Sequence, residues 1–151
     1  MSTISTHKLL PKTQPILIVE DSPDDFEATK RAFGKANLRN EIEHAVSGER
    51  ALEYLRSDKV KPGIILLDLN MPGLDGRKTL EIIKKTDNLK KIPIVILTTS
   101  NDERDVKACY ELGANTFIQK PVDFDGLIAA IRRLKEYWFE IAVLPKGNGG
   151  D

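Results

Sequence analysis

Residues 64–76 have the sequence IILLDLNMPGLDG, in which four aliphatic residues run directly into an acidic one. Comparable short apolar runs lie at residues 16–19, 42–46, 94–97 and 116–118. Runs of Ile, Val and Leu without polar alternation are typical of parallel strands buried on both faces. The segments between the runs have helical periodicity, and strands that alternate with helices form parallel sheets through right-handed crossovers. The pattern therefore predicts a doubly wound α/β domain with five strands.

Residues 42–46 differ from the other runs because polar and apolar side chains alternate there, which is typical of an edge strand. Local signals also predict where helices begin and end. Ser22 followed by Pro23 is a helix start, and Asp123 is another, whereas Gly113 is a left-handed helix end. These signals support helices in the gaps between the runs.

Apolar side chains at helical spacing predict the inward faces of the first and last helices. Phe26 and Phe33 are seven residues apart and are expected to face the core. The last helix carries one apolar stripe at intervals of three or four residues, formed by Leu127, Ile131, Leu134, Trp138 and Ile141.

The chain has 151 residues, of which 40% are hydrophobic and 30% charged, so we expect one compact domain. We assign residues 1–14 to a flexible N-terminal segment, 15–138 to the domain and 139–151 to a C-terminal extension and tail. The single cysteine, Cys109, excludes an intramolecular disulfide and is expected to pack in a helix. Because nothing resembles a signal peptide or a membrane span, we expect a cytoplasmic protein.

The charges balance, since 23 basic residues offset 23 acidic ones and the net charge is zero. This balance removes the usual electrostatic argument for binding nucleic acid or membranes. The acidic residues are nevertheless concentrated at residues 20–27. Most of them are interpreted as a solvated helix face, but Glu20 and Asp21 follow a buried run and are candidate cation ligands. His7 and His44 lack metal-like spacing and are interpreted as structural or solvated.

In doubly wound sheets, ligands bind outside the carboxyl ends of the strands. The polar residues expected at those ends are Glu20, Asp21, Asp68, Asn70, Thr98 and Lys120. Three carboxylates brought together repel one another unless a divalent cation neutralises them. Because the ligands offered are oxygen atoms, Mg²⁺ is favoured. A carboxylate on such a metal can attack phosphorus to give an acyl phosphate, whose charge Lys120 and Thr98 would help to balance.

Four segments in order, each at an expected strand end, resemble the receiver domain of two-component response regulators. They are ILIVED (16–21), IILLDLNMPGLDG (64–76), IPIVILTTS (92–100) and FIQKP (117–121). The resemblance runs from about residue 16 to residue 138. It implies a flavodoxin-like (CheY-like) sheet of strand order 2-1-3-4-5 with five helices.

The resemblance also implies roles for individual residues. Asp68 corresponds to the phosphoacceptor, Asp21 to a direct Mg²⁺ ligand, Glu20 to an acid acting through water, and Asn70 to a backbone carbonyl ligand. Thr98 corresponds to the switch hydroxyl, and Phe117 to the rotating aromatic residue. Lys120 corresponds to the lysine that pairs with the phosphate, and Pro121 to a proline after a cis peptide bond.

The sequence departs from the family pattern at the site. Glu20 stands where aspartate is commoner, and Thr99 stands where alanine or glycine is usual. A branched side chain at position 99 is expected to narrow access to Asp68. Together with Asn70 and Ser100, it is expected to influence the lifetime of the phosphate.

A narrower resemblance is to single-domain receivers paired with cyanobacterial phytochrome histidine kinases. It rests on the LTTS strand end, on the helix end at Tyr110, and on an aromatic extension formed by Tyr137, Trp138 and Phe139. In that group the extension takes part in dimerisation, which implies a homodimer. The same side chains could instead cover the sheet of their own chain.

The main hypothesis is a signalling switch, phosphorylated by a sensor histidine kinase, that acts through protein contacts and is not a turnover enzyme. Because we expect no DNA-binding module after the domain, the expected output is protein contact or phosphotransfer. One alternative is a phosphorylation-independent receiver-like binding module. An aspartyl phosphatase is disfavoured because the general-acid position two residues after Asp68 holds Asn70. Nucleotide binding is weaker still, since there is no P-loop.

Overall fold

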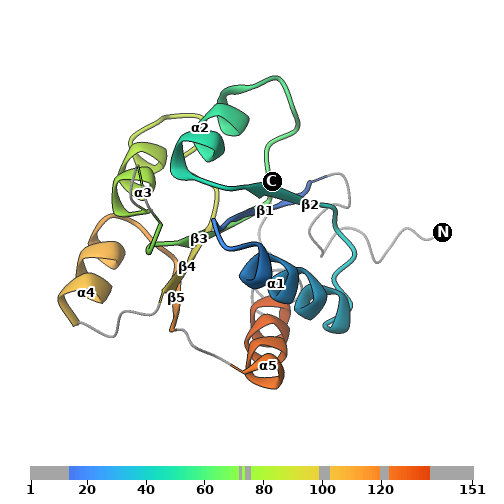
Figure 1. The fold of residues 1–151 in the computed structure, drawn as a ribbon. Helices are drawn as coiled ribbons and strands as arrows, with labels where there is room; N and C mark the ends of the chain where they lie inside the picture. The colour runs from blue at the N-terminus through green and yellow to red at the C-terminus, as the bar shows by residue number, and fades with distance from the viewer. Residues whose placement is uncertain (1–13, 72, 74–75, 99–102, 120–122, 137–151) are drawn as a thin grey trace.

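The computed structural model describes residues 14–71, 73, 76–98, 103–119 and 123–136. In this part of the chain, strands and helices alternate (Figure 1). The strands are β1 (Ile16–Val19), β2 (Ile42–Ala45), β3 (Ile64–Asp68), β4 (Ile94–Thr98) and β5 (Thr116–Gln119). The helices are α1 (Pro23–Lys35), α2 (Gly48–Arg56), α3 (Gly76–Lys84), α4 (Glu103–Glu111) and α5 (Phe124–Leu134). The predicted alternation is confirmed.

All strand pairs are parallel, in the order β2-β1-β3-β4-β5. The predicted flavodoxin-like sheet is therefore confirmed, and so is the edge position of β2. The order reverses direction between β1 and β3, so the carboxyl ends of these two neighbours border the crevice where such sheets bind ligands.

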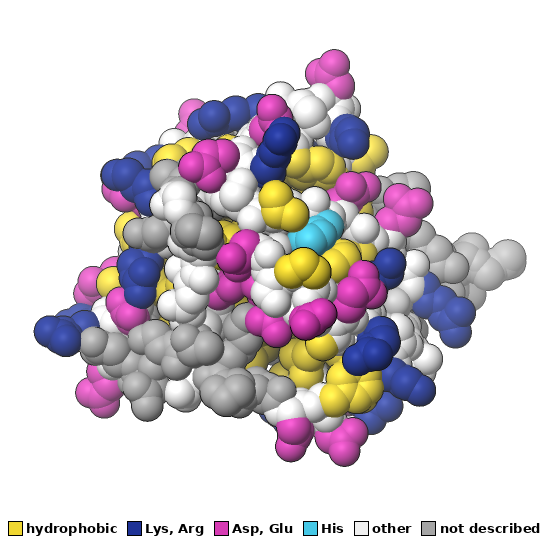
Figure 2. All heavy atoms as spheres, viewed as in Figure 1, with side chains coloured by type: hydrophobic (Ala, Val, Ile, Leu, Met, Phe, Trp, Pro, Cys, Tyr) yellow, Lys and Arg dark blue, Asp and Glu magenta, His cyan; other side chains and the backbone are white. Residues whose placement is uncertain are grey.

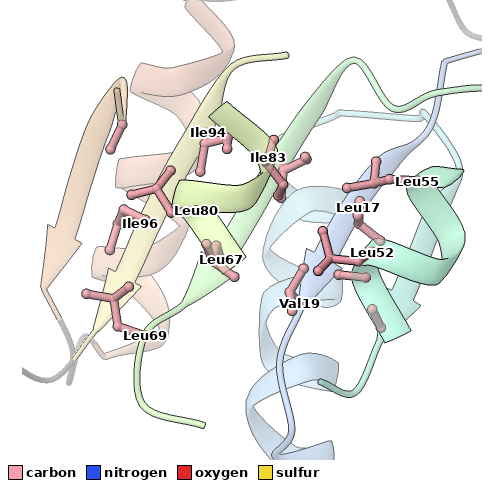
Figure 3. Packing of buried hydrophobic residues seen from close by; sticks show 14 of the residues in the cluster. Leu17, Val19, Leu52, Leu55, Leu67, Leu69, Leu80, Ile83, Ile94 and Ile96 are labelled. Atoms are coloured by element: carbon pink, nitrogen blue, oxygen red, sulfur yellow. The ribbon is translucent and has the colours of Figure 1, made fainter. Parts of the chain in front are cut away.

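Helices cover both faces of the sheet, with α1 and α5 on one side and α2, α3 and α4 on the other (Figure 1). Alternate residues of each central strand serve the two layers. Leu17, Val19 and Leu67 point toward α2 and α3 (Figure 3), whereas Ile18 and Leu66 join the core beneath α1 and α5. Cys109 is fully buried in the first of these layers, in agreement with the packing role predicted for it.

The predicted helix caps are present. The Ser22 hydroxyl oxygen accepts a hydrogen bond from the Asp25 backbone N–H at 3.2 Å. The Asp123 carboxylate accepts one from the Gly126 N–H at 2.7 Å. Gly113 follows α4 with φ of +107°, a left-handed conformation that favours glycine.

Strand ends differ from the sequence prediction by one residue. Asp68 and Thr98 were expected after their strands, but each is the last residue of its strand. The reason is pairing with a neighbour, because Asp68 lies opposite Leu97 and Thr98 opposite Gln119. Both side chains are therefore held on hydrogen-bonded strands and not on loops.

The prediction for the inward face of α1 is confirmed, since Phe26 and Phe33 both pack against the core beneath α1 and α5. Phe33 is buried, but Phe26 is partly buried at the edge of the core, where its ring stacks on His44. The stack forms because β2 is an edge strand and leaves the His44 ring exposed beside the first turn of α1. His44 therefore has specific contacts, which agrees with the structural role that was one of its two interpretations from the sequence.

Several predictions fall on residues outside the described ranges. The segments 1–13 and 137–151 are among them, so the proposed domain boundaries remain predictions. Within the described ranges, no helix combines the length and apolarity needed to cross a membrane.

Candidate functional site

Three carboxylates meet at the carboxyl edge of the sheet. Strands β1 and β3 are adjacent and in register, with Val19 opposite Leu67, so the residues that follow these positions lie side by side. One carboxylate oxygen each from Glu20, Asp21 and Asp68 lies within 4.8 Å of the other two. Like charges this close repel, and a cation between them relieves the repulsion. The structure thus brings together the three acids that the sequence singled out.

The local backbone orients two of these acids. The Asn70 N–H donates to Asp68 Oδ1 at 2.9 Å, and the Ser22 N–H donates to Glu20 Oε2 at 3.2 Å. Glu20 and Asp68 are both buried, whereas Asp21 is exposed. The cluster therefore has a buried floor and one acid facing solvent, an arrangement that lets a partly hydrated cation enter.

Thr98 connects the neighbouring strand to the loop after Asp68. Its hydroxyl donates to Asn70 Oδ1 at 2.6 Å, and its side chain is completely buried. Phe117, on the next strand, is partly buried against the layer beneath α2, α3 and α4, and its ring centroid lies 6.5 Å from that of Tyr110 on α4. A path of direct contacts thus leads from Asp68 through Asn70 to Thr98.

The start of α3 lies very close to the phosphoacceptor candidate. A Cβ added at Gly76 would stand 2.6 Å from the Leu69 Cα and 2.7 Å from the Asp68 carbonyl oxygen. No side chain fits there without a backbone shift. Gly76 is the last residue of the segment IILLDLNMPGLDG, but only the packing explains why it must be glycine.

Arg77, the next residue, ties α3 to α4. Its guanidinium donates to both carboxylate oxygens of Asp105, at 3.0 and 2.6 Å. The two residues are 28 positions apart, and sequence reasoning missed the pair because nothing local marks it. A bidentate arginine–carboxylate pair of this kind is stronger and more specific in its geometry than a single lysine contact.

Some predicted site residues lie outside the described part of the chain. They are Thr99, Ser100, Lys120, Pro121, Tyr137, Trp138 and Phe139. Their predicted roles are neither supported nor contradicted by the geometry above.

Comparison with known proteins agrees with this fold and site. Residues 16–132 match the family described as the response regulator receiver domain, and the chain belongs to that family. The response regulator Rcp1 of Synechocystis is 36% identical over 135 residues, which cover 86% of this chain and 92% of the relative. The probable methanogenesis regulatory protein FilR2 of Methanothrix harundinacea is 36% identical over 127 residues, 82% of each chain.

Solved structures give the same answer. The phosphorylated cyanobacterial phytochrome response regulator RcpA superposes with a TM-score of 0.80 at 34% identity, covering 88% of this chain and 99% of that one. The Mn²⁺-bound form of Rcp1 gives a TM-score of 0.78 at 35% identity, covering 87% and 99%. An oxygen-only acidic cluster in a chain similar to a metal-bound receiver supports divalent cation binding here.

Proposed function

We propose that this chain is a response regulator receiver whose Asp68 accepts a phosphoryl group from a sensor histidine kinase in an Mg²⁺-dependent reaction. The observation that carries the proposal is the cluster of Glu20, Asp21 and Asp68 at the sheet edge. Receiver domains as a class partner with sensor histidine kinases, which supports the donor.

The reacting groups of the transfer are a carboxylate oxygen of Asp68 and the phosphoryl group of the donor. One oxygen of Asp68 attacks phosphorus, the acyl phosphate bond forms, and the bond from phosphorus to the donor nitrogen breaks with its electron pair. The donor imidazole takes up a proton as it leaves. A bound cation supplies charge neutralisation for the transferring group.

We assign the remaining roles from the family pattern and from the contacts described above. Asp21 and Asp68 would hold the cation directly, and so would the backbone carbonyl oxygen of Asn70. Glu20 would act through a water molecule. Lys120, which precedes Pro121, would pair with the phosphate. Small movements at such a site become larger ones when packing has two discrete arrangements.

The output step uses two side chains of neighbouring strands. The Thr98 hydroxyl would leave its Asn70 partner and donate to a phosphoryl oxygen. Phe117 would then move inward and change the surface of α4, β5 and α5, through which a partner is recognised.

The contacts of Asn70 favour a switch over a turnover phosphatase. An aspartyl phosphatase needs a general acid two residues after its nucleophile, and here the amide oxygen of Asn70 accepts a hydrogen bond from Thr98. An amide cannot deliver the proton that catalytic turnover requires. A phosphorylation-independent binding module remains the alternative, and it would recognise its partner equally well with Asp68 replaced.

The test is incubation with acetyl phosphate, with and without Mg²⁺, followed by intact-mass measurement and mapping of the modified residue. We expect one phosphoryl group per chain, on Asp68, only when Mg²⁺ is present. The adduct should be lost under alkaline conditions, as acyl phosphates are. Modification elsewhere, or none at saturating Mg²⁺, would refute the assignment.

Replacing Asp21 with asparagine is expected to weaken Mg²⁺ binding by about tenfold or more, because one anionic ligand is removed. Titration calorimetry or Mn²⁺ competition measures the change. Asp24→Asn is the matched control, since Asp24 is an exposed acid in the first turn of α1 outside the cluster. Equal losses in the two variants would mean that the cation is attracted by general negative charge and not held by the cluster.

We further propose a phytochrome-type histidine kinase as the donor, a cytoplasmic location, and a homodimer formed through the extension with Tyr137, Trp138 and Phe139. The likeness to RcpA and Rcp1 supports the first point. No direct nucleic-acid or membrane partner is proposed, because the net charge is zero.

The dimer is tested by light scattering on the full chain and on a chain ending after Glu136, each with and without phosphorylation. We expect the full chain to have twice the monomer mass in at least one state and the shortened chain to be a monomer in both. Identical masses for the two chains would remove the role of the extension.

A further inference from the structure

We propose that His44 is a positioning residue for the metal site, holding the backbone of Glu20 in place from the neighbouring edge strand. This inference rests on the proposed function, because it concerns the same acidic cluster. The Nε2 atom of His44 lies 2.8 Å from the backbone carbonyl oxygen of Glu20. Since a carbonyl oxygen only accepts, this contact requires the hydrogen on Nε2.

Residues at the end of β2 hydrogen-bond both the backbone N–H and the backbone carbonyl oxygen of Glu20. The Glu20 N–H donates to the Ala45 carbonyl oxygen at 2.9 Å, and the adjacent residue, His44, donates to the Glu20 carbonyl oxygen. The first bond continues the ladder between β1 and β2, whereas the second goes beyond what strand pairing supplies. The His44 side chain thus adds one hydrogen bond to the backbone of Glu20, the residue immediately before Asp21.

The ring of His44 is itself held in a fixed orientation. Its centroid lies 3.7 Å from that of Phe26, and the two rings are within 4° of parallel. Phe26 belongs to the first turn of α1, where its N–H donates to the Ser22 carbonyl oxygen at 2.9 Å, and its side chain packs against the core beneath α1 and α5. His44 therefore bridges the two ends of the short connection between β1 and α1, which carries the acids.

The location of His44 distinguishes this role from ordinary packing. The side chain is exposed on an edge strand, so burial of apolar area does not account for its placement. Figure 2 shows the histidine side chain in cyan on the same face as a group of acidic side chains, with apolar side chains beside it. Its two contacts join a strand end to a helix start.

Such a bridge has a physical purpose in a cluster of like charges. Repulsion among Glu20, Asp21 and Asp68 favours opening of the β1–α1 connection whenever no cation is bound. A contact to a neutral carbonyl oxygen resists that opening without adding charge among the ligands. Less conformational entropy of the β1–α1 connection is then lost when a cation binds, which is how supporting contacts raise metal affinity.

Two substitutions separate the two contacts of His44. His44→Phe keeps an aromatic ring for Phe26 but removes the donor, whereas His44→Gln keeps an N–H donor of similar reach but removes the ring. The probe is Mn²⁺, measured by electron paramagnetic resonance of the free ion. The second measurement is the acetyl phosphate reaction rate as a function of Mg²⁺ concentration.

We expect His44→Phe to weaken Mn²⁺ binding about three- to tenfold, the loss expected for one hydrogen bond, and His44→Gln to bind near the wild-type level. In His44→Phe the Mg²⁺ concentration for half-maximal phosphorylation should rise by the same factor, with the maximal rate unchanged. A merely structural role would lower the maximal rate or the folded fraction and would not be rescued by glutamine.

Three results would overturn the proposal: both variants binding like wild type, both weakened equally, or only His44→Gln weakened. Only the last result would assign the effect to the ring stack, whereas equal weakening would mean that the hydrogen bond by itself does not account for the effect. If wild-type protein binds no Mn²⁺ and is not phosphorylated, the proposed function fails as well. The wild-type measurement thus separates the two failures.

Discussion

Replacing Asp68 with asparagine is expected to abolish Mg²⁺-dependent phosphorylation by acetyl phosphate. The amide nitrogen of asparagine has no electron pair available to attack phosphorus, although its oxygen can still accept the hydrogen bond that the Asn70 N–H donates to Asp68 Oδ1. The substitution is nearly isosteric, so the buried strand end should be preserved. The measurement is intact mass after incubation with excess donor.

A matched control shows that the loss is specific. Asp87 has a 98% exposed side chain outside the acidic cluster, and Asp87→Asn should be phosphorylated at the wild-type rate. Full labelling of Asp68→Asn would end the case for this acceptor, wherever the phosphate is then found.

The same variant tests the electrostatics of the cluster in the absence of metal. Removing one of three neighbouring negative charges should raise the free energy of unfolding by about 1 kcal/mol, because repulsion among the carboxylates destabilises the fold. Urea denaturation with a chelator present measures the change. A variant that is both folded and unlabelled confirms that chemistry, and not the fold, was lost.

Replacing Gly76 with alanine is expected to destabilise the protein by about 1–3 kcal/mol, the usual cost of overpacking a closely fitted site. The added Cβ would lie 2.6 Å from the Leu69 Cα and 2.7 Å from the Asp68 carbonyl oxygen, and backbone atoms cannot swing aside as a side chain does. Either α3 or the end of β3 must move. Chemical denaturation measures the loss.

The shift should also reach the proposed reaction, because the displaced atoms belong to Asp68 and its neighbour. We expect slower phosphorylation of Gly76→Ala by acetyl phosphate even under conditions where the variant is fully folded. Such a result would link the packing of α3 to the acceptor geometry.

The control for this prediction is another glycine in a helix. A Cβ at Gly34, in α1, would meet nothing within 4 Å. Gly34→Ala should therefore be neutral or stabilising by up to about 1 kcal/mol, since alanine is the better helix former. If both variants have wild-type stability and rate, the close approach at Gly76 carries no cost and the prediction is wrong.

Local patterns predicted the elements because their signals are local. A continuous apolar run such as residues 64–67 marks a buried strand, and Ser22 with Pro23 marks a helix start through the unsatisfied N–H groups of the first turn. The predicted strands ended one residue too early, because Asp68 and Thr98 still belong to their strands. Whether a strand continues depends on the neighbouring strand across the sheet, which a local pattern does not contain.

The acids of the candidate site were predictable for a related reason. Parallel strands end at the same edge, so residues that follow buried runs converge once the strand order is known, as the 4.8 Å cluster of Glu20, Asp21 and Asp68 illustrates. The His44 contacts were not predictable in this way. They join an edge strand to a helix whose distance and angle are set by packing.

The sequence by itself therefore determined the alternation of strands and helices, the buried runs and the acids at their ends, because periodicity and capping depend on residues close together in the chain. Only the tertiary structure decided why position 76 must be glycine, which residue Arg77 pairs with, and what His44 holds. These three features depend on atoms that the fold brings together from different segments of the chain. At such short distances, a few tenths of an ångström decide whether a side chain fits or a hydrogen bond forms.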